Sequence, residues 1–250
     1  MVDAEPGHRT LLSLDVEKSG SRSDTGSELL RAVLSKALVH ALVAAGIDPV
    51  ECELADTGDG LIAHIPPTVA KTRVITTVLT ELAGSLRHDN REAAPGNQVR
   101  IRASIHAGEL RRDEHGLTGR AKALLARQLD DEQVRRILAE APATATVVCA
   151  VSDSFYRDVI EPGNVGVDPE KFSEITIRNK ETVTPAWVTI VGHAAPVVPA
   201  EPREPAPTTA STPVTNNFSG ITFTGNSTVK VRGDVVQQKN VYNGAPHPGT

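Results

Sequence analysis

Two acidic residues have types and positions that suit metal chemistry. Asp15 ends a short apolar segment that predicts a central strand, and Asp59 lies between two glycines in a turn-forming segment. In a split sheet the strands carrying them are neighbours, so we expect the carboxylates to converge. Paired carboxylates suit Mg²⁺, which prefers oxygen ligands and substrate phosphates. The alternative is that Asp59 only shapes the turn and Asp15 caps a helix or is solvated.

The elements that would position these carboxylates follow a β-α-β-β-α-β order. Apolar runs and alternation predict strands, and apolar residues at helical spacing predict helices. These elements are a strand over 10–17, a helix over 26–45, strands over 50–54 and 61–65 joined by a turn, a helix over 68–86, a strand over 99–109 and a helix over 119–129. Further segments predict strands over 145–151 and 183–191 and a helix over 152–160. We therefore predict an α+β fold with a ferredoxin-like split sheet.

Composition excludes several classes of protein. A net charge of −5 argues against a protein that coats nucleic acid, which usually has a basic face. No apolar run approaches the roughly 20 residues that span a bilayer, and the N-terminus lacks the features of a signal peptide. Cys52 and Cys149 lie in apolar surroundings and are expected to be buried, reduced thiols, and His64 and His106 to be structural. We expect a cytoplasmic protein.

The chain is expected to divide into a domain and a tail. Residues 1–8 are expected to be disordered, and residues 9–192 form the domain. Six prolines in residues 193–215 predict an extended linker, because proline interrupts helices and strand ladders. Residues 216–244 are rich in Asn, Gly, Thr, Val and Gln and have too little apolar material for a core, and residues 245–250 are expected to be disordered.

Four motifs in this order resemble those of class III adenylate and guanylate cyclases. LSLDVEKSG at 12–20 resembles the first metal-binding motif of that family, and GDGLIA at 58–63 resembles the second. ASIHAGE at 103–109 is similar to a strand that usually reads Ile-Gly-Ile-His-x-Gly-Glu. Gly119 and Arg127 have the spacing of the family's glycine and catalytic arginine. The resemblance covers residues 9–192.

The resemblance implies a two-metal phosphoryl-transfer site between two copies of the domain. Asp15 and Asp59 would bind Mg²⁺ or Mn²⁺, which would hold a nucleoside triphosphate and activate its ribose hydroxyl. Arg127 would stabilise negative charge on the phosphates. Val16 and Lys122 would also contact the nucleotide. A symmetric homodimer is implied because the family's active site forms between two domains.

Three positions depart from the family's pattern. The residues expected to read the base correspond to Ala55 and Gly116, and the ribose-orienting asparagine corresponds to Ala123. None of these side chains can donate or accept a hydrogen bond. The ion-binding half of the site is thus retained, whereas the catalytic half is eroded.

The tail resembles bacterial amyloid signalling motifs related to the RIP homotypic interaction motif. The features shared with them are Asn-Phe-x-Gly, a β-rich repeat and Val-Val-Gln before a final glycine. The positions that carry them here are Asn217, Phe218, Gly220, Phe223, Gly225, Val235, Val236 and Gln237. Short apolar pairs separated by glycine, with Asn and Gln side chains that can stack in ladders, favour cross-β assembly. The alternatives are a disordered tail or a hairpin that docks on its own domain.

Three functional hypotheses follow. In the first, the chain is a cyclase-like effector that binds a metal–nucleotide complex. An immune-type receptor with a matching amyloid motif recruits it, and the raised local concentration favours its dimers. In the second, the domain is catalytically inactive and acts as a nucleotide-sensing or scaffolding module. In the third, it is an active cyclase with an incidental tail.

Overall fold

A computed structural model describes most of the first 198 residues and two short strands beyond them. The described residues are 5–17, 24–58, 60–94, 97–114, 116–178, 183–198, 216–218 and 221–223. The chain divides into two units, residues 1–200 and residues 201–250. Each unit is therefore described by itself.

The first unit is a mixed α+β fold around one sheet. Its strands are β1 (Gly7–Val16), β2 (Glu53–Asp56), β3 (Gly60–Ile65), β4 (Ile101–Asp113), β5 (Gly116–Thr118), β6 (Val147–Ser152), β7 (Ser173–Arg178) and β8 (Val183–Ile190). Its helical segments are α1 (Asp24–Ala44), α2 (Lys71–Arg73), η2 (Val74–Val78), α3 (Leu79–Glu92), α4 (Arg120–Asp130), α5 (Glu132–Glu140), α6 (Asp153–Phe155), η4 (Tyr156–Ile160) and η5 (Pro169–Lys171).

The sheet has eight strands and an open order. The order is β2-β3-β1-β4-β6-β8-β7, with β5 paired to the far end of β4. Only β4 and β6 are parallel, and every other pair is antiparallel. The expected neighbours β1 and β3 are paired from Thr10 opposite Ile65 to Asp15 opposite Gly60. The predicted α+β fold with a split sheet is confirmed.

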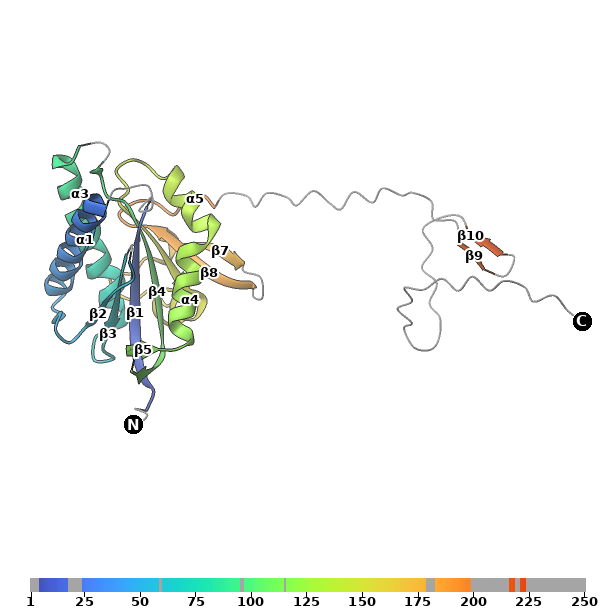
Figure 1. Ribbon diagram of the computed structural model, residues 1–250, viewed down its shortest axis with the longest axis horizontal. Helices are drawn as coiled ribbons and strands as arrows, with labels where there is room; N and C mark the ends of the chain where they lie inside the picture. Colours follow the sequence, from blue (N-terminus) through green and yellow to red (C-terminus); the bar gives the residue numbers. More distant parts are fainter. Residues whose placement is uncertain are drawn as a thin grey trace, which may run out of the picture. The chain divides into compact units, whose positions relative to one another are not determined.

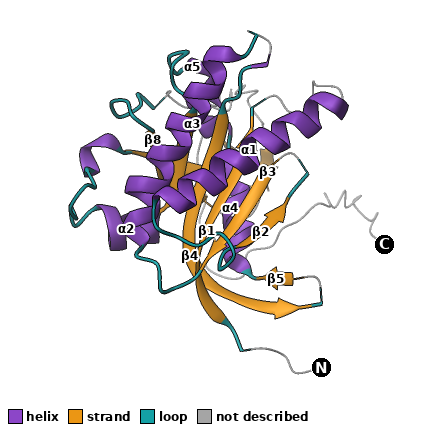
Figure 2. Cartoon of the chain, turned by 90° about the vertical axis from the view of Figure 1, so that its left-hand side faces the viewer, coloured by secondary structure: helices purple, strands orange, loops and turns teal. Residues whose placement is uncertain are grey.

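Helices cover both faces of this sheet, which explains why β1 reads as a nearly continuous apolar run. Figure 1 shows α1 and α3 on one side of the sheet and α4 and α5 on the other. Figure 2 looks onto the side of α1 and α3. Leu12 and Leu14 are fully buried in the cluster formed with α1 and α3, whereas Leu11 is fully buried against Leu125 of α4. Successive β1 residues thus alternate between two cores.

Three local features differ from the sequence-based expectations. The strand expected over 50–54 begins later in the structure, because β2 begins at Glu53. Val50 is 91% exposed and lies in a turn, where its amide donates a 2.9 Å hydrogen bond to Asp48 Oδ1. The helix α5 and the strand β7 were not predicted. The cap of α5 is Asp131, whose carboxylate accepts from the amides of Gln133 and Val134. Asp131 separates α5 from α4, and an aspartate at this position of a helical run is the sequence signal for a second helix that begins there.

The tail is described only at two short strands. β9 (Asn216–Phe218) pairs antiparallel with β10 (Ile221–Phe223), with Phe218 opposite Ile221. Asn217, Phe218 and Phe223 therefore lie in strands. The other positions of the predicted amyloid motif fall outside the described residues. They are Gly220, Gly225, Val235, Val236 and Gln237.

The beginning of the proline-rich segment contacts the first unit. Pro196 is buried, and its carbonyl accepts a hydrogen bond of 2.7 Å from Ser173 Oγ of β7. Val198 packs against the apolar cluster that α5 shares with β7 and β8. Both cysteines are free and buried, as expected. Among the residues that the structure describes, no helix is long and apolar enough to cross a membrane.

We expect the first unit to fold without the tail, provided that Pro196 is kept. A chain ending at residue 200 should give a cooperative thermal transition by circular dichroism. A chain ending at residue 192 loses the hydrogen bond to Pro196, worth about 1 kcal/mol, and should melt at least about 2–4 °C lower. A longer chain that aggregates or melts without a cooperative transition would contradict this domain boundary.

Candidate functional site

The candidate site lies where the C-terminal end of β1 meets the turn between β2 and β3. Asp15 pairs with Gly60, the residue that follows Asp59. Asp59 itself lies outside the described residues, so the convergence of the two carboxylates remains a prediction. Asp15 occupies the same face of β1 as Leu11, the face that packs against α4.

The glycines of the turn have a structural reason for being there. A Cβ atom on Gly60 would lie 1.9 Å from the carbonyl oxygen of Leu14, so only glycine lets β3 approach β1 this closely. Gly58 has a φ of +97°, which favours glycine, and its amide donates to Asp56 Oδ1 at 2.6 Å. The backbone therefore requires the glycines at 58 and 60, independently of any chemistry at position 59.

The carboxylate of Asp15 is already paired. Asp15 and Arg102 are opposite each other on β1 and β4, and the Arg102 guanidinium donates a hydrogen bond to Asp15 Oδ2. Both side chains are only 13% exposed. Two residues further along the chain, the Glu17 carboxylate oxygen Oε2 lies 3.7 Å from Arg100 Nε. Arg100 also donates a hydrogen bond to the carbonyl of Leu138 in α5. Two carboxylates thus face two guanidinium groups across β1 and β4.

Among the residues that the structure describes, Asp15 is held by a guanidinium and not by a set of metal ligands. Asp15 is engaged by Arg102, and the described residues contain no group of three His, Cys, Asp or Glu side chains that could hold a metal ion. Metal binding by Asp15 and Asp59 therefore stays a prediction. Val16 is 3% exposed and lies in the core cluster with α1 and α3, so its side chain faces away from Asp15.

The helix α4, which carries the remaining candidate residues, begins in close contact with β4. A Cβ atom on Gly119 would lie 2.8 Å from the carbonyl oxygen of Glu109, and one on Gly108 would lie 3.1 Å from Ala121 Cβ. Both glycines thus let the first turn of α4 approach the strand. The glycine of the predicted Gly119–Arg127 pair therefore has a packing explanation.

The polar groups of α4 have partners or positions of their own. Lys122 Nζ donates a 2.9 Å hydrogen bond to the carbonyl of Leu117 in β5, so its ammonium group is held at the β4–β5 hairpin. Arg127 and Ala123 are exposed on the helix surface. The buried Gln128 instead accepts a hydrogen bond from Ser104 Oγ of β4 at 2.5 Å.

The positions expected to read a base have structural roles. Ala55 packs against the apolar cluster between the sheet and α4. Gly116 has a φ of +108° in the turn between β4 and β5, a conformation that favours glycine. Neither position offers a side-chain donor or acceptor.

The two predicted structural histidines are packed and hydrogen-bonded. His64 Nδ1 lies 2.8 Å from the carbonyl oxygen of Glu53, so Nδ1 carries the proton and donates. Its Nε2 is buried and has no hydrogen-bond partner among the described residues. His106 Nδ1 lies 2.7 Å from Ser152 Oγ. Burial lowers the pKa of both imidazoles.

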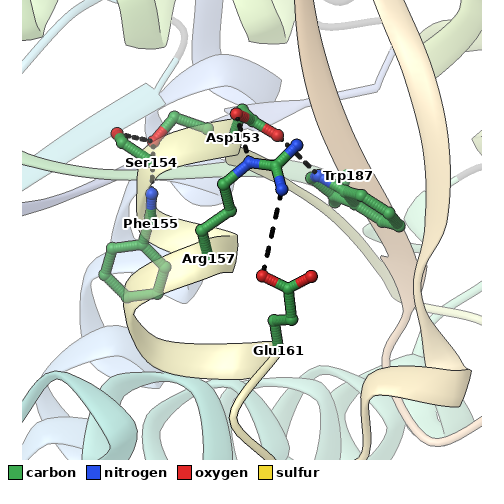
Figure 3. Close-up of polar contacts among 7 residues, drawn as sticks. Asp153, Ser154, Phe155, Arg157, Glu161 and Trp187 are labelled. Atoms are coloured by element: carbon green, nitrogen blue, oxygen red, sulfur yellow. Dashed lines mark hydrogen bonds and ion pairs between the residues drawn. The ribbon is translucent and has the colours of Figure 1, made fainter.

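A second polar network, which the sequence reading missed, joins η4 to β8. Figure 3 shows Arg157 between Asp153 and Glu161, with its Nε 2.9 Å from Asp153 Oδ2. Trp187 donates to the other oxygen of Asp153 at 3.1 Å and stacks on Tyr156 with ring centroids 3.7 Å apart. The hydrogen bond from Arg157 lowers the pKa of Asp153. The four-residue spacing of the three charges was the available signal.

Comparison with solved structures finds cyclase domains. The chain is similar to the guanylyl cyclase Cya2, with a TM-score of 0.52, 13% identity, and coverage of 81% of this chain and 98% of that chain. It is also similar to an adenylate/guanylate cyclase/hydrolase from Silicibacter pomeroyi, with a TM-score of 0.50, 15% identity, and coverage of 76% of this chain and 100% of that chain. A bacterial light-regulated adenylyl cyclase matches with a TM-score of 0.51 and 12% identity, and the match covers 78% of this chain and 54% of that chain. No protein-family model and no curated protein matches the sequence.

These similarities establish the fold. The first unit has the fold of class III adenylate and guanylate cyclase domains, as the sequence motifs predicted. A shared fold does not by itself carry activity, so the chemistry must be argued from the site.

We expect acid to destabilise the first unit through its histidines. The folded-state pKa of His64 and His106 lies below the ordinary value of about 6.5, so the unfolded chain takes up these protons first. Stability present above about pH 6.5 should be lost as the pH falls below it. The melting temperature should drop between pH 7.5 and 5.5. His64→Asn, whose amide can still donate to Glu53, should reduce that drop. An NMR titration that places the pKa of His64 at or above 6.5 would contradict the assignment.

Proposed function

We propose that the first unit is a catalytically inactive signalling module with the cyclase fold. The arrangement on α4 carries this proposal: Lys122 is bonded to the main chain of Leu117, and Ala123 presents a methyl group where a ribose-orienting asparagine is expected. The neighbouring Arg127 has no oriented polar group beside it at position 123 to align a substrate.

The magnitude of the expected defect supports this choice. Removing one oriented polar donor from an active site typically costs about 2.7–4 kcal/mol of transition-state stabilisation, a factor of about 10²–10³ in rate. The module lacks the ribose contact at Ala123 and both base contacts at Ala55 and Gly116. Because the base contacts also select between ATP and GTP, a nucleotide bound here would be held mainly by its phosphates.

A second candidate is an effector that binds a metal–nucleotide complex and retains residual turnover. One observation favours it: Asp15 pairs with Gly60 across β1 and β3, and the predicted ligand Asp59 directly precedes Gly60 in the chain. In this alternative Mg²⁺ or Mn²⁺ would be held by both carboxylates. A nucleoside triphosphate is the ligand class under both proposals.

The tail supplies the proposed means of recruitment. Its Asn-Phe-x-Gly and Val-Val-Gln segments support assembly with a receptor or another protein that carries a matching amyloid motif. Tethering several copies raises their local concentration and favours a homodimer of the folded units. The proline-rich segment between them would let the tail assemble without unfolding the module.

A product assay separates the two candidates. The full-length protein incubated with ATP or GTP and Mg²⁺ or Mn²⁺ should yield no cyclic nucleotide by mass spectrometry above the level of an Asp15→Ala, Arg127→Ala variant. Cyclic product from the wild type that this double variant lacks would contradict the proposal and support the effector with turnover.

The tail is expected to form cross-β fibrils. A peptide spanning residues 216–244 should assemble with spacings of roughly 4.7 Å along the fibril and 10 Å between sheets in X-ray fibre diffraction. Gln237→Asp should prevent assembly, because it places a like charge on every layer of a dry interface. Phe218→Lys should act in the same way at the other end of the motif.

Two results would contradict the amyloid proposal. One is a wild-type peptide that stays monomeric at high concentration after seeding. The other is a Gln237→Asp peptide that forms fibrils as readily as the wild type. In the full-length protein neither substitution should change the melting temperature of the first unit.

A further inference from the structure

One edge of the sheet is formed by a strand whose residues are symmetric in character. β7 is the last strand in the sheet order, and β8 is its only neighbour among the strands that the structure describes (Figure 1). Thr176 is flanked on both sides by isoleucine, Ile175 and Ile177. Two positions from Thr176 on either side lie the charged residues Glu174 and Arg178. Because their charges are opposite, an antiparallel copy of this strand would match it residue for residue.

Both ends of β7 are covered by other parts of the first unit. At its start, Ser173 Oγ donates a 2.7 Å hydrogen bond to the carbonyl of Pro196. At its end, the amide of Arg178 donates to the carboxylate of Asp131, the cap of α5. Pairing with a further strand is therefore confined to the middle of β7.

The main-chain groups in the middle of β7 point away from β8. Thr176 lies opposite Pro185, which has no N–H group and cannot donate to β7. The amide of Arg178 reaches Asp131 and so points away from β8. Main-chain groups alternate between the two sides of a strand, so those of Thr176 and Glu174 point the same way. The edge therefore presents the N–H and C=O groups of these two residues to a further strand.

The side chains of β7 lie on two different faces. Ile175 and Ile177 are 3% and 4% exposed and belong to the apolar cluster that includes α5. Glu174 and Arg178 are exposed, and Thr176 is half-buried, on the opposite face. A strand added at this edge would thus continue an apolar layer on one face and meet charged side chains on the other.

The signs of the charges distinguish this edge from one that is protected against pairing with itself. Charged side chains commonly protect edge strands, and like charges that face each other across a strand pair are destabilising. A two-fold axis at Thr176 instead brings Glu174 of each copy opposite Arg178 of the other. It also brings Ile175 of each copy opposite Ile177 of the other. Opposite charges and apolar side chains are cross-strand pairs of the stabilising kind.

We propose that β7 pairs antiparallel with β7 of a second copy of this chain, about a two-fold axis at Thr176, so that two sheets join edge to edge. Such a contact uses the same surface on both copies, as two-fold homodimers do. The inference goes beyond the proposed function, because the pairing needs neither turnover nor the tail. The contact also lies apart from Asp15, because β4, β6 and β8 separate β7 from β1 in the sheet.

The pairing is weak in dilute solution and forms when copies are concentrated. Stable interfaces have about 20–30 residues on each side, many more than the segment 174–178 supplies. Tethering creates effective concentrations in the millimolar range, at which a weak contact is populated. Any device that holds copies of the chain together therefore favours the joined sheets.

Cross-linking of the full-length protein tests the pairing residue by residue. Thr176→Cys puts two thiols opposite each other on the proposed axis, with Cβ atoms about 5 Å apart. A short bis-maleimide should then give a covalent dimer on a denaturing gel. The wild type should not, because Cys52 and Cys149 are buried. Lys36→Cys, at an exposed position of α1, is the matched control and should give little dimer.

Charge reversal in the Thr176→Cys protein tests the predicted partners. Arg178→Glu should slow the formation of the covalent dimer about tenfold, because two attractive cross-strand pairs become repulsive. Glu174→Arg should do the same. The combination of both reversals should restore the rate, because the facing charges are then exchanged but again opposite. Thermal melts by circular dichroism verify that each variant is folded, and Glu174→Arg carries the test alone if Arg178→Glu does not fold.

Three results would overturn the proposal. They are a Thr176→Cys protein that cross-links no faster than Lys36→Cys, a rate that charge reversal leaves unchanged, and a combined variant that stays as slow as the single reversals. All these variants carry the same tail, so their comparison does not depend on whether the tail forms fibrils. Cyclic product from the wild type would refute catalytic inactivity and leave these rates as they are.

Discussion

The pairing of β1 with strands on both of its edges is the constraint on which the rest of the first unit depends. β1 is hydrogen-bonded to β3 on one side and to β4 on the other, and its residues are buried by helices on both faces. A one-residue shift in the pairing register of β1 would exchange the two faces of this strand and put Asp15 among the buried leucines. The register therefore fixes the core and the position of the carboxylate together.

Three glycines let the backbones of neighbouring elements approach one another closely around β1 and β4. Gly60 lets β3 lie against Leu14, and Gly108 and Gly119 let the start of α4 lie against β4. Side chains at these positions would hold the elements apart and open the cluster around Leu11. The glycines of the cyclase-like motifs thus explain why the fold is retained even where polar groups of the motifs are missing.

The pairing of β1 with β4 also determines what the carboxylate of Asp15 contacts. In the arrangement described here, Asp15 is neutralised by a neighbouring strand and Lys122 is bonded to a main-chain carbonyl. A shifted register would separate these largely covered charges, and a charge without a partner away from water is unfavourable.

The sequence alone determined the order of the elements around the site, because apolar periodicity and glycine positions are local properties of the chain. It placed Asp15 at the end of β1 and Gly58 and Gly60 in a turn. It missed α5 and β7 and began β2 too early, because an Asp131 cap within a helical run and short edge strands give weak local signals. Only the tertiary structure decided what Asp15 and Lys122 contact. Arg102 is 87 residues from Asp15, and only the pairing of β1 with β4 brings the guanidinium to the carboxylate.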